Sequence, residues 1–349
     1  AVWNSATKTS ERGWTAEVRV PFSQLRFPAR PSHVWGLNIT RRTVRNNEWA
    51  RIVNTRKGET GFVSHFADLV GLEGIQRGRP MEIVPYAVAR SDVLTRADRT
   101  NPLLETMDHR LDGGLDLKYG LTSTLTLTGT VNPDFGQVEV DPAVVNLSQF
   151  ETFYPEKRPF FTEGANLFDF GDTPAPSHFN FFSAPSLFYS RRIGKQPGRF
   201  APPDNSETIH QPEATTILGA GKFSGKTAAR TSFGVLDAVT ASEYALIEDT
   251  ETGLRRRHQL EPRTNSLIGR VQQDLGTNSS VGMTMTAVNG EDFRPAYVGG
   301  VDSNLKWRQN AYGLYTRLAG SRAGTDLDPQ KGYEGTAYFY KFSGWFGGQ

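Results

Sequence analysis

Apolar and polar residues alternate in short segments along most of the chain, and this period of two constrains the fold more than any other feature. A typical segment places Leu115, Leu117 and Tyr119 on one face of a strand and Asp116 and Lys118 on the other. The 35 glycines and 20 prolines favour many turns. We predict an all-β, antiparallel fold with about eleven strands after Pro80, near 81–90, 111–119, 122–132, 186–193, 213–223, 228–240, 264–275, 279–289, 296–307, 309–319 and 333–344.

The alternation suits a wall that has lipid on one side and water on the other. A barrel strand crosses a membrane with about 10 residues, every second one facing lipid, whereas a membrane helix needs about 20 apolar residues in a row. In one later segment Val281, Met283 and Met285 oppose Thr284 and Thr286. We therefore predict an outer-membrane-type β-barrel from a Gram-negative cell envelope. The odd number of segments predicts a barrel that is incomplete, in a chain truncated at both ends.

The first region, residues 1–78, has a different pattern and predicts the last strands of a β-sandwich. Residues 15–22 and 35–42 alternate at period two around a proline-rich loop, so we expect them to form paired strands. Four of the six tryptophans fall in this region. They could fill the core of a small domain, or they could stack on sugar rings as exposed aromatic faces do. The candidates for ligand binding here are Trp14, Trp35 and Trp49.

The middle segment, residues 133–185, interrupts the strands. Asp141 and Pro142 form a helix start, and apolar residues then recur at helical spacing until Pro155 ends the run. A short helix between barrel strands is well placed to fold inward, so we predict a plug or a long loop here.

A charged cluster within and after this segment is the best candidate site. Two of its carboxylates could act as acid and base on a glycosidic bond. They could instead form a salt-bridge network that holds the plug to the wall, or contact a substrate in the lumen. The residues are Glu151, Glu156 and Glu163, with Lys157, Arg158, Arg191 and Arg192. Weaker candidates for a calcium site are Asp134, Glu139 and Asp141, whose spacing is not that of an EF-hand.

Other chemistries have little support in the sequence. The 39 basic and 37 acidic residues give a net charge of +2, which argues against a nucleic-acid partner. The six histidines form no metal-binding motif, and the absence of cysteine excludes thiolate ligands, so we expect no cofactor. Residues 220–227, AGKFSGKT, miss a phosphate-binding loop by one glycine and lead into a strand pattern. We expect no nucleotide partner, and we interpret SGK as a hairpin turn.

The string VNPDFGQVEVDPAVVNLSQFETFYPEKRPFFTEGANLF, with GGLDLKYGLTSTLTL before it and LFYSRRIG and TTILGAGKFSGKTA after it, resembles an outer-membrane β-barrel family of unknown function. In that family the barrel follows a domain similar to carbohydrate-binding module family nine. The strings GWTAEVRVPFSQLRF and WGLNITRR of this chain resemble the last strands of that domain. The resemblance runs along most of the chain. It implies a sugar-binding-like sandwich in residues 1–78 and a barrel in residues 79–349.

These observations predict a non-catalytic outer-membrane protein that contacts membrane lipid and binds a glycan or another envelope polymer. This binding could be coupled to transport through the barrel. A surface or secreted glycan hydrolase using Glu151, Glu156 or Glu163 is the alternative, and a structural envelope scaffold is a second one.

Overall fold

The computed structural model describes residues 3–11, 13–22, 25, 27, 30–54, 63–75, 81–93, 103, 107–133, 153–171, 186–199, 207–276, 278–291, 294–325 and 328–341. The fold is all-β, and every strand pairing in this part of the chain is antiparallel. The helix predicted from Asp141 onward lies outside these residues.

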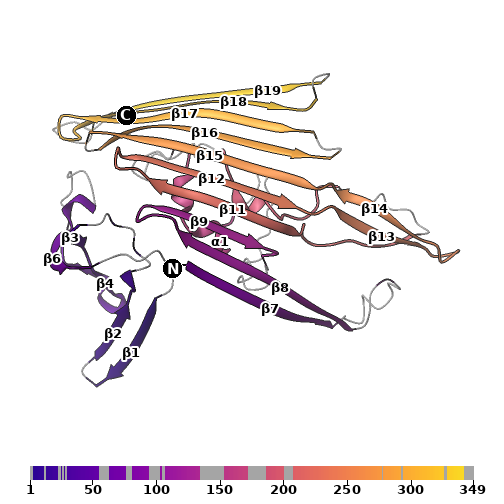
Figure 1. Cartoon of the computed structure of the whole chain (residues 1–349), viewed down its shortest axis with the longest axis horizontal. Coiled ribbons are helices and arrows are strands. Elements are labelled where there is room, and N and C mark those ends of the chain that lie inside the picture. The colour runs from indigo at the N-terminus through magenta and orange to yellow at the C-terminus, as the bar shows by residue number, and fades with distance from the viewer. Residues whose placement is uncertain are drawn as a thin grey trace.

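One large sheet dominates the molecule (Figure 1). It has ten strands in the order β19-β18-β17-β16-β15-β12-β11-β9-β8-β7, so strands that follow one another in the chain are mostly neighbours. Its strands are β7 (Met81–Val93), β8 (Met107–Gly120), β9 (Leu125–Val131), β11 (Ile217–Lys226), β12 (Thr231–Thr240), β15 (Thr264–Leu275), β16 (Ser279–Gly290), β17 (Ala296–Trp307), β18 (Tyr312–Ala323) and β19 (Gln330–Lys341). The alternation in the sequence therefore predicted where the strands of this sheet lie along the chain.

One predicted strand, 186–193, is wrong. Its residues instead contain the 3₁₀ turn η6 (Ser190–Arg192). The Arg158 guanidinium donates hydrogen bonds to the backbone carbonyls of Ser190 (2.8 Å) and Ile193 (2.7 Å), which gives this backbone partners outside any sheet. The predicted turn at Ser224–Lys226 is also displaced, because these residues still belong to β11 and the turn follows at 227–230.

A second sheet was not predicted. It contains β10 (Glu207–His210), β13 (Glu243–Asp249) and β14 (Arg255–Glu261), in the order β10-β13-β14. Figure 1 shows β13 and β14 continuing past the end of the large sheet between β12 and β15. Ala245, Ile247 and Leu260 form a small buried core of its own.

The N-terminal region forms three two-stranded sheets beside one end of the large sheet (Figure 1). Its elements are β1 (Asn4–Ser10), β2 (Gly13–Arg19), β3 (Ser32–Leu37), β4 (Thr40–Thr43), η2 (Val44–Asn46), β5 (Glu48–Arg51), η3 (Val63–His65) and β6 (Ala67–Glu73). The predicted pairing of 15–22 with 35–42 is wrong, because β2 pairs with β1, β3 with β6 and β4 with β5. The second segment is divided at Asn38, whose side chain hydrogen-bonds to the backbone N–H and C=O of Val53, both at 3.1 Å.

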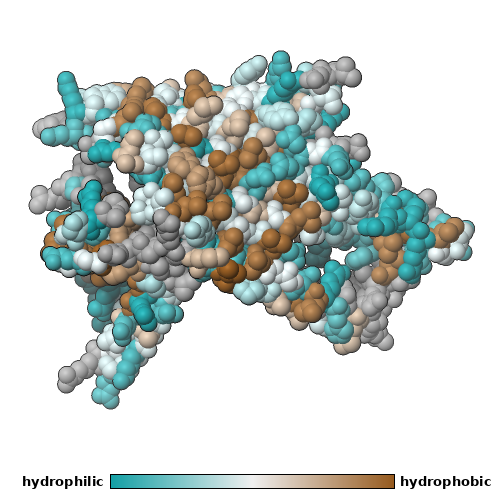
Figure 2. Space-filling model, in the orientation of Figure 1, coloured by the Kyte–Doolittle hydropathy of each residue, from teal (hydrophilic) through white to brown (hydrophobic). Residues whose placement is uncertain are grey.

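The two faces of the large sheet have reversed polarity compared with a water-soluble sheet. On one face, called the outer face here, Val271, Met283, Val301 and Leu318 lie side by side in register on β15 to β18. These four side chains are 50%, 59%, 50% and 59% exposed. Figure 2 shows apolar residues spread across a face of the sheet.

The opposite face, called the inner face, buries polar and charged side chains. Lys222, Arg270, Thr284 and Arg317 are all less than 5% exposed. The register places Arg270 opposite Thr284, and the alternation puts both on the face opposite to Val271 and Met283. The charged side chains that are buried on the inner face require partners of opposite charge or hydrogen-bond acceptors. Other residues of the same chain supply these partners.

Candidate functional site

Residues 153–171 and 186–199, called the inner segment here, lie against the inner face of the large sheet. The segment contains α1 (Pro159–Thr162), η5 (Ala165–Leu167) and η6. Proline at the first helical position starts α1, and Gly164, with φ of 68°, follows it in the left-handed region. The main core joins the segment to β11, β12 and β15 through Phe160, Phe161, Phe168, Ile193, Ile217, Leu236, Ala238 and Ile268.

Two aromatic rings of the inner segment rest on glycines of the sheet. A Cβ at Gly234 would lie 3.0 Å from the ring of Phe168, and one at Gly300 would lie 2.6 Å from the ring of Phe170. Both distances are shorter than side chains tolerate without a shift. Glycine at these two inward positions therefore lets the segment approach the sheet closely.

Phe170 lies between two buried arginines. Its ring is 5.9 Å from the guanidinium carbon of Arg270 and 5.1 Å from that of Arg317, within the range of cation–π attraction. Arg270 also forms a bidentate pair with Asp302, with N–O distances of 2.7 and 3.0 Å, and donates to the Thr284 hydroxyl at 2.6 Å. Arg317 pairs with Glu334. The inner face is thus a network of charges across β15 to β19.

Two lysines of the sheet hold the end of α1. Lys222 Nζ donates to the backbone carbonyl oxygens of Phe160 (2.5 Å) and Glu163. Lys118 forms an ion pair with the Glu163 carboxylate at 2.7 Å. These contacts cap the carbonyl end of the helix with positive charge, which is the favourable sign for that end.

A third network organises the start of the inner segment around Glu156. Both of its carboxylate oxygens accept from Arg158, Oε1 from Nε at 2.8 Å and Oε2 from Nη2 at 2.6 Å. Oε2 also accepts from the Ser190 hydroxyl at 2.6 Å, and Oε1 from the backbone N–H groups of Lys157 and Arg158. Since Arg158 also binds the carbonyls of Ser190 and Ile193, this pair ties the two parts of the segment together.

The pKa values of the two described carboxylates of the predicted cluster follow from these partners. Burial alone would raise the pKa of Glu156, but the hydrogen bonds and charge of Arg158 and the Ser190 hydroxyl outweigh it and lower the pKa below 4.5. For Glu163 burial is likewise outweighed by the Lys118 hydrogen bond and by the charges of Lys118 and Lys222, so its pKa is also lowered. Both groups are therefore held as anions, whereas a general acid needs a raised pKa.

The structure separates the predicted cluster into these two networks. Arg191 joins the Glu156 network, donating to the Pro155 carbonyl at 2.8 Å and lying 5.7 Å over the Tyr154 ring. Arg192 is exposed in η6, and Lys157 is half-buried beside Glu156. Glu151 lies outside the described residues, as do Asp134, Glu139 and Asp141. Within the described part of the chain, no three His, Asp or Glu side chains are grouped as a metal would require.

Several functional residues were missed from sequence. Lys222 and Arg317 were not selected, and Lys118 and Arg270 were placed only on a polar face. Lys222 belongs to the string resembling a phosphate-binding loop, but residues 220–226 lie within β11 and no such loop forms. A pattern in the sequence could have identified Lys222. It is a long basic side chain at a strand position, and the residues two positions before and after it, Ala220 and Ser224, are small.

The N-terminal tryptophans differ in exposure. Trp14 and Trp49 are 60% and 53% exposed, so the core-packing alternative is wrong for them. Trp35 is half-buried and contacts the rings of Phe22 and Phe27 at 5.8 and 5.3 Å.

Arginines lie over both exposed rings. The guanidinium carbon of Arg41 is 5.7 Å from the centre of Trp14, and that of Arg42 is 5.2 Å from the centre of Trp49. This combination of aromatic face and donor group can bind a polar ligand with a flat apolar side.

Fold and site together define an all-β protein whose ten-stranded sheet buries a charged face under its own inner segment. The chain belongs to the family described as domain of unknown function (DUF5916), which matches residues 81–348, from the first residue of β7 onward. No curated protein and no solved structure matches the chain. None of the helices in the described residues is long and apolar enough to cross a membrane.

We expect Glu156 to stabilise the fold in a pH-dependent way. Because its pKa is lowered in the folded protein, its contribution is present above about pH 4.5 and is lost as the pH falls through the folded pKa. Glu156→Gln should lower the free energy of unfolding at pH 7 by about 1–3 kcal/mol, and by less at pH 4. Urea unfolding in detergent at the two pH values measures both effects. The exposed Glu251→Gln is the control, and equal losses in the two variants would contradict the assignment.

The contact of Phe170 with the sheet gives a second prediction. Gly300→Ala should destabilise the protein by about 1–3 kcal/mol, since its Cβ would overlap the Phe170 ring. Gly299→Ala is a matched control on the neighbouring residue, where a Cβ meets nothing within 4 Å. Thermal unfolding and protection of the inner segment from protease report the difference. Identical behaviour of the two variants would show that Phe170 does not rest on Gly300.

Proposed function

We propose that the large sheet is the wall of an outer-membrane-type β-barrel in a Gram-negative cell envelope. The observation that carries this proposal is the reversed polarity of the sheet, with a row of exposed apolar residues on the outer face and buried Lys222, Arg270 and Arg317 on the inner face. A lipid surface would make such an outer face favourable. Among the described residues β7 and β19 each pair on one side only, and a closed barrel would require a further pairing at both of these edges.

In this proposal the inner segment is the plug of the barrel. It covers the charged face with its own aromatic rings and carbonyl groups, as the Phe170 and Lys222 contacts illustrate. Water would otherwise have to solvate these charges inside the barrel. The inner segment belongs to the connection between β9 and β11, so a movement of the plug would leave the two strands that it connects in the wall.

The connections between strands suggest an orientation. Turns at one end of the strands are short, namely 121–124, 227–230, 276–278 and 308–311. Connections at the other end are longer, namely 94–106, 132–216, 241–263, 291–295 and 324–329. Outer-membrane barrels have short periplasmic turns and longer extracellular loops. β7 starts at the short-turn end, which in this proposal favours the periplasmic side for the N-terminal region.

The biochemical role we infer is non-catalytic binding of a glycan or a related envelope polymer by a carbohydrate-binding-like sandwich in residues 1–78. The exposed faces of Trp14 and Trp49, each with an arginine beside it, support this role. Binding on the periplasmic side would be coupled to passage through the barrel by movement of the plug. The lowered pKa values of Glu156 and Glu163 favour a structural network over a glycan hydrolase.

The barrel is tested by its migration on a detergent gel. We expect the full-length protein, extracted from outer-membrane fractions, to migrate differently before and after boiling. Val301→Arg should destabilise the folded barrel, which is the species seen without boiling, by about 2–4 kcal/mol. This is the cost of an arginine on the lipid face near the bilayer centre.

Val18→Arg is the control for this experiment, because Val18 is similarly exposed, at 57% against 50% for Val301, but belongs to the N-terminal region. A protein that stays soluble without detergent and shows no shift on boiling would overturn the barrel.

Glycan binding is tested by tryptophan fluorescence. We expect soluble cell-wall glycans to quench the emission, and Trp14→Ala or Trp49→Ala to weaken binding by about tenfold through loss of a stacking face. Trp307→Ala, at the short-turn end of β17, is the control. Equal affinity in all variants would exclude these rings from the binding site.

A further inference from the structure

Two rows of aromatic and basic side chains cross the outer face of β17, β18 and β19, one near each end of these strands. The alternation puts both rows on the same face as Val301 and Leu318. The register aligns three residues in each, namely Trp307, Tyr312 and Lys341 in the short-turn row and Tyr297, Arg322 and Lys331 in the long-connection row. The two rows are therefore the borders of one stretch of the outer face.

The short-turn row is held together by its aromatic rings. The rings of Trp307 and Tyr312 are stacked, with centroids 6.0 Å apart and planes 13° apart. The cationic groups of Arg308 and Lys341 lie 5.7 and 5.8 Å from the centre of the Tyr312 ring. Aromatic rings with a polar edge and long basic side chains beside them are typical of the lipid headgroup level.

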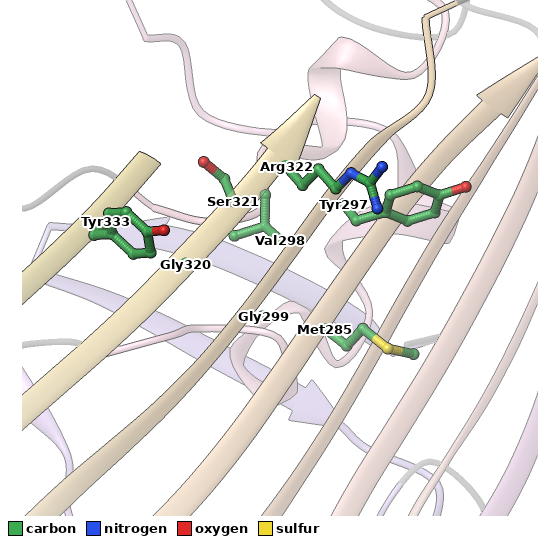
Figure 3. Close-up of a pocket in the computed structure, with 8 residues that line it drawn as sticks. All are labelled: Met285, Tyr297, Val298, Gly299, Gly320, Ser321, Arg322 and Tyr333. Atoms are coloured by element: carbon green, nitrogen blue, oxygen red, sulfur yellow. The ribbon is translucent and has the colours of Figure 1, made fainter. Parts of the chain in front are cut away.

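The long-connection row lies at the edge of an apolar hollow. Figure 3 shows the side chain of Arg322 extending towards the ring of Tyr297. The Tyr297 hydroxyl donates a hydrogen bond to Asn289 Oδ1 at 2.7 Å. One step along the strands, Gly299 and Gly320 are paired and line the hollow. Polar atoms thus give way to apolar surface within one outward step.

The stretch between the rows carries no charged side chain on the outer face of these three strands, all of whose residues the structure describes. The Ser303 and Thr316 hydroxyls in its middle lie 2.7 Å apart and form a hydrogen bond with each other, so they need no water. The charged residues at these levels, Asp302, Arg317 and Glu334, occupy alternate positions on the inner face. The outward positions are Gly299, Val301, Ser303 and Leu305, then Leu314, Thr316, Leu318 and Gly320, and finally Tyr333, Gly335, Ala337 and Phe339.

The distance between the rows matches a thin bilayer. Each strand runs ten residues from one row to the other, from 297 to 307, from 312 to 322 and from 331 to 341. Ten residues of antiparallel strand extend about 34 Å. A barrel tilt of about 40° reduces this to about 26 Å along the membrane normal. The apolar band of outer-membrane barrels is about 25 Å tall, whereas an average bilayer has a hydrocarbon core of about 30 Å.

We propose that the two rows are the membrane interfaces of this protein and that its lipid partner is a bilayer with a hydrocarbon core of about 26 Å. The inference rests on the proposed barrel and deepens it by naming the lipid-facing residues and the bilayer thickness. The second sheet continues past the long-connection end of the large sheet between β12 and β15 (Figure 1), so it lies outside the hydrocarbon on that side.

The test measures the depth of spin labels in dimyristoyl phosphatidylcholine vesicles that contain the full-length protein. This chain has no cysteine that would compete with an introduced one. Oxygen concentrates in hydrocarbon and a nickel complex in water, so the ratio of their effects on a label reports its depth. The ratio should be highest at Val301→Cys and Ser303→Cys and fall towards both Tyr297→Cys and Trp307→Cys. Leu254→Cys in the second sheet is the control, since it is 71% exposed against 50% for Val301 but should be accessible to nickel.

The cost of an added charge gives a second measurement in the same vesicles. Leu318→Arg, between the rows, should lower the folding equilibrium constant by about thirtyfold or more, and Tyr297→Arg, in the long-connection row, by about fivefold or less. In dierucoyl phosphatidylcholine, whose longer chains exceed the distance between the rows, the folding equilibrium constant of the parent protein should fall.

The outcomes separate the interfaces from the barrel. Equal effects of the two arginines, a depth maximum at either row, or undiminished stability in the thicker bilayer would overturn the inference and leave the barrel standing. Equal nickel access at Val301→Cys and Leu254→Cys would refute the barrel itself.

Discussion

Pairing of buried cations is the constraint on which the structure depends. A lysine or arginine removed from water needs hydrogen-bond partners and a compensating charge, or it destabilises the fold by several kcal/mol. Arg270 meets this need with Asp302 on β17, two strands away, and Arg317 with Glu334 on the neighbouring strand β19. Lys222 meets it with backbone carbonyls of the inner segment. The inner segment therefore contributes to the electrostatics of the sheet, and its removal would take away the carbonyl partners of Lys222 and the carboxylate partner of Lys118.

Alternation in the sequence was sufficient to locate the ten-stranded sheet, because its strands are long and their two faces differ consistently. The alternation did not predict the secondary structure correctly where other interactions determine the backbone conformation. Apolar and polar residues alternate in 186–193, yet the carbonyl oxygens of Ser190 and Ile193 accept hydrogen bonds from Arg158, and the backbone forms a 3₁₀ turn instead of a strand. The strands β13 and β14 were missed because charged residues such as Glu248 and Arg255 interrupt the pattern and pair with each other across the hairpin, at 2.7 Å. Pairing partners in the N-terminal region depend on long-range contacts that periodicity does not encode.

The candidate site was predicted in part. Sequence reasoning selected Glu156, Glu163 and Arg158, since charges concentrated beside prolines and aromatics stand out. It could not assign Glu163 to Lys118 and Lys222, which are distant in sequence and reach it only because the register aligns β8, β9 and β11. The close approach of the Phe168 and Phe170 rings to Gly234 and Gly300 likewise cannot be read from the sequence, because it depends on where the inner segment lies.

The pairing of β9 with β11 has a consequence for assembly. These strands are hydrogen-bonded neighbours, yet residues 132–216 lie between them in the chain. Closing a flexible loop of that length costs about 4 kcal/mol in chain entropy, so β9 and β11 should meet late unless the intervening chain is already ordered. Docking of the aromatic residues onto β12 and β15 would shorten the effective loop and bring the two strands into register. The inner segment would then act as an internal template for folding, enclosed by the wall as it forms.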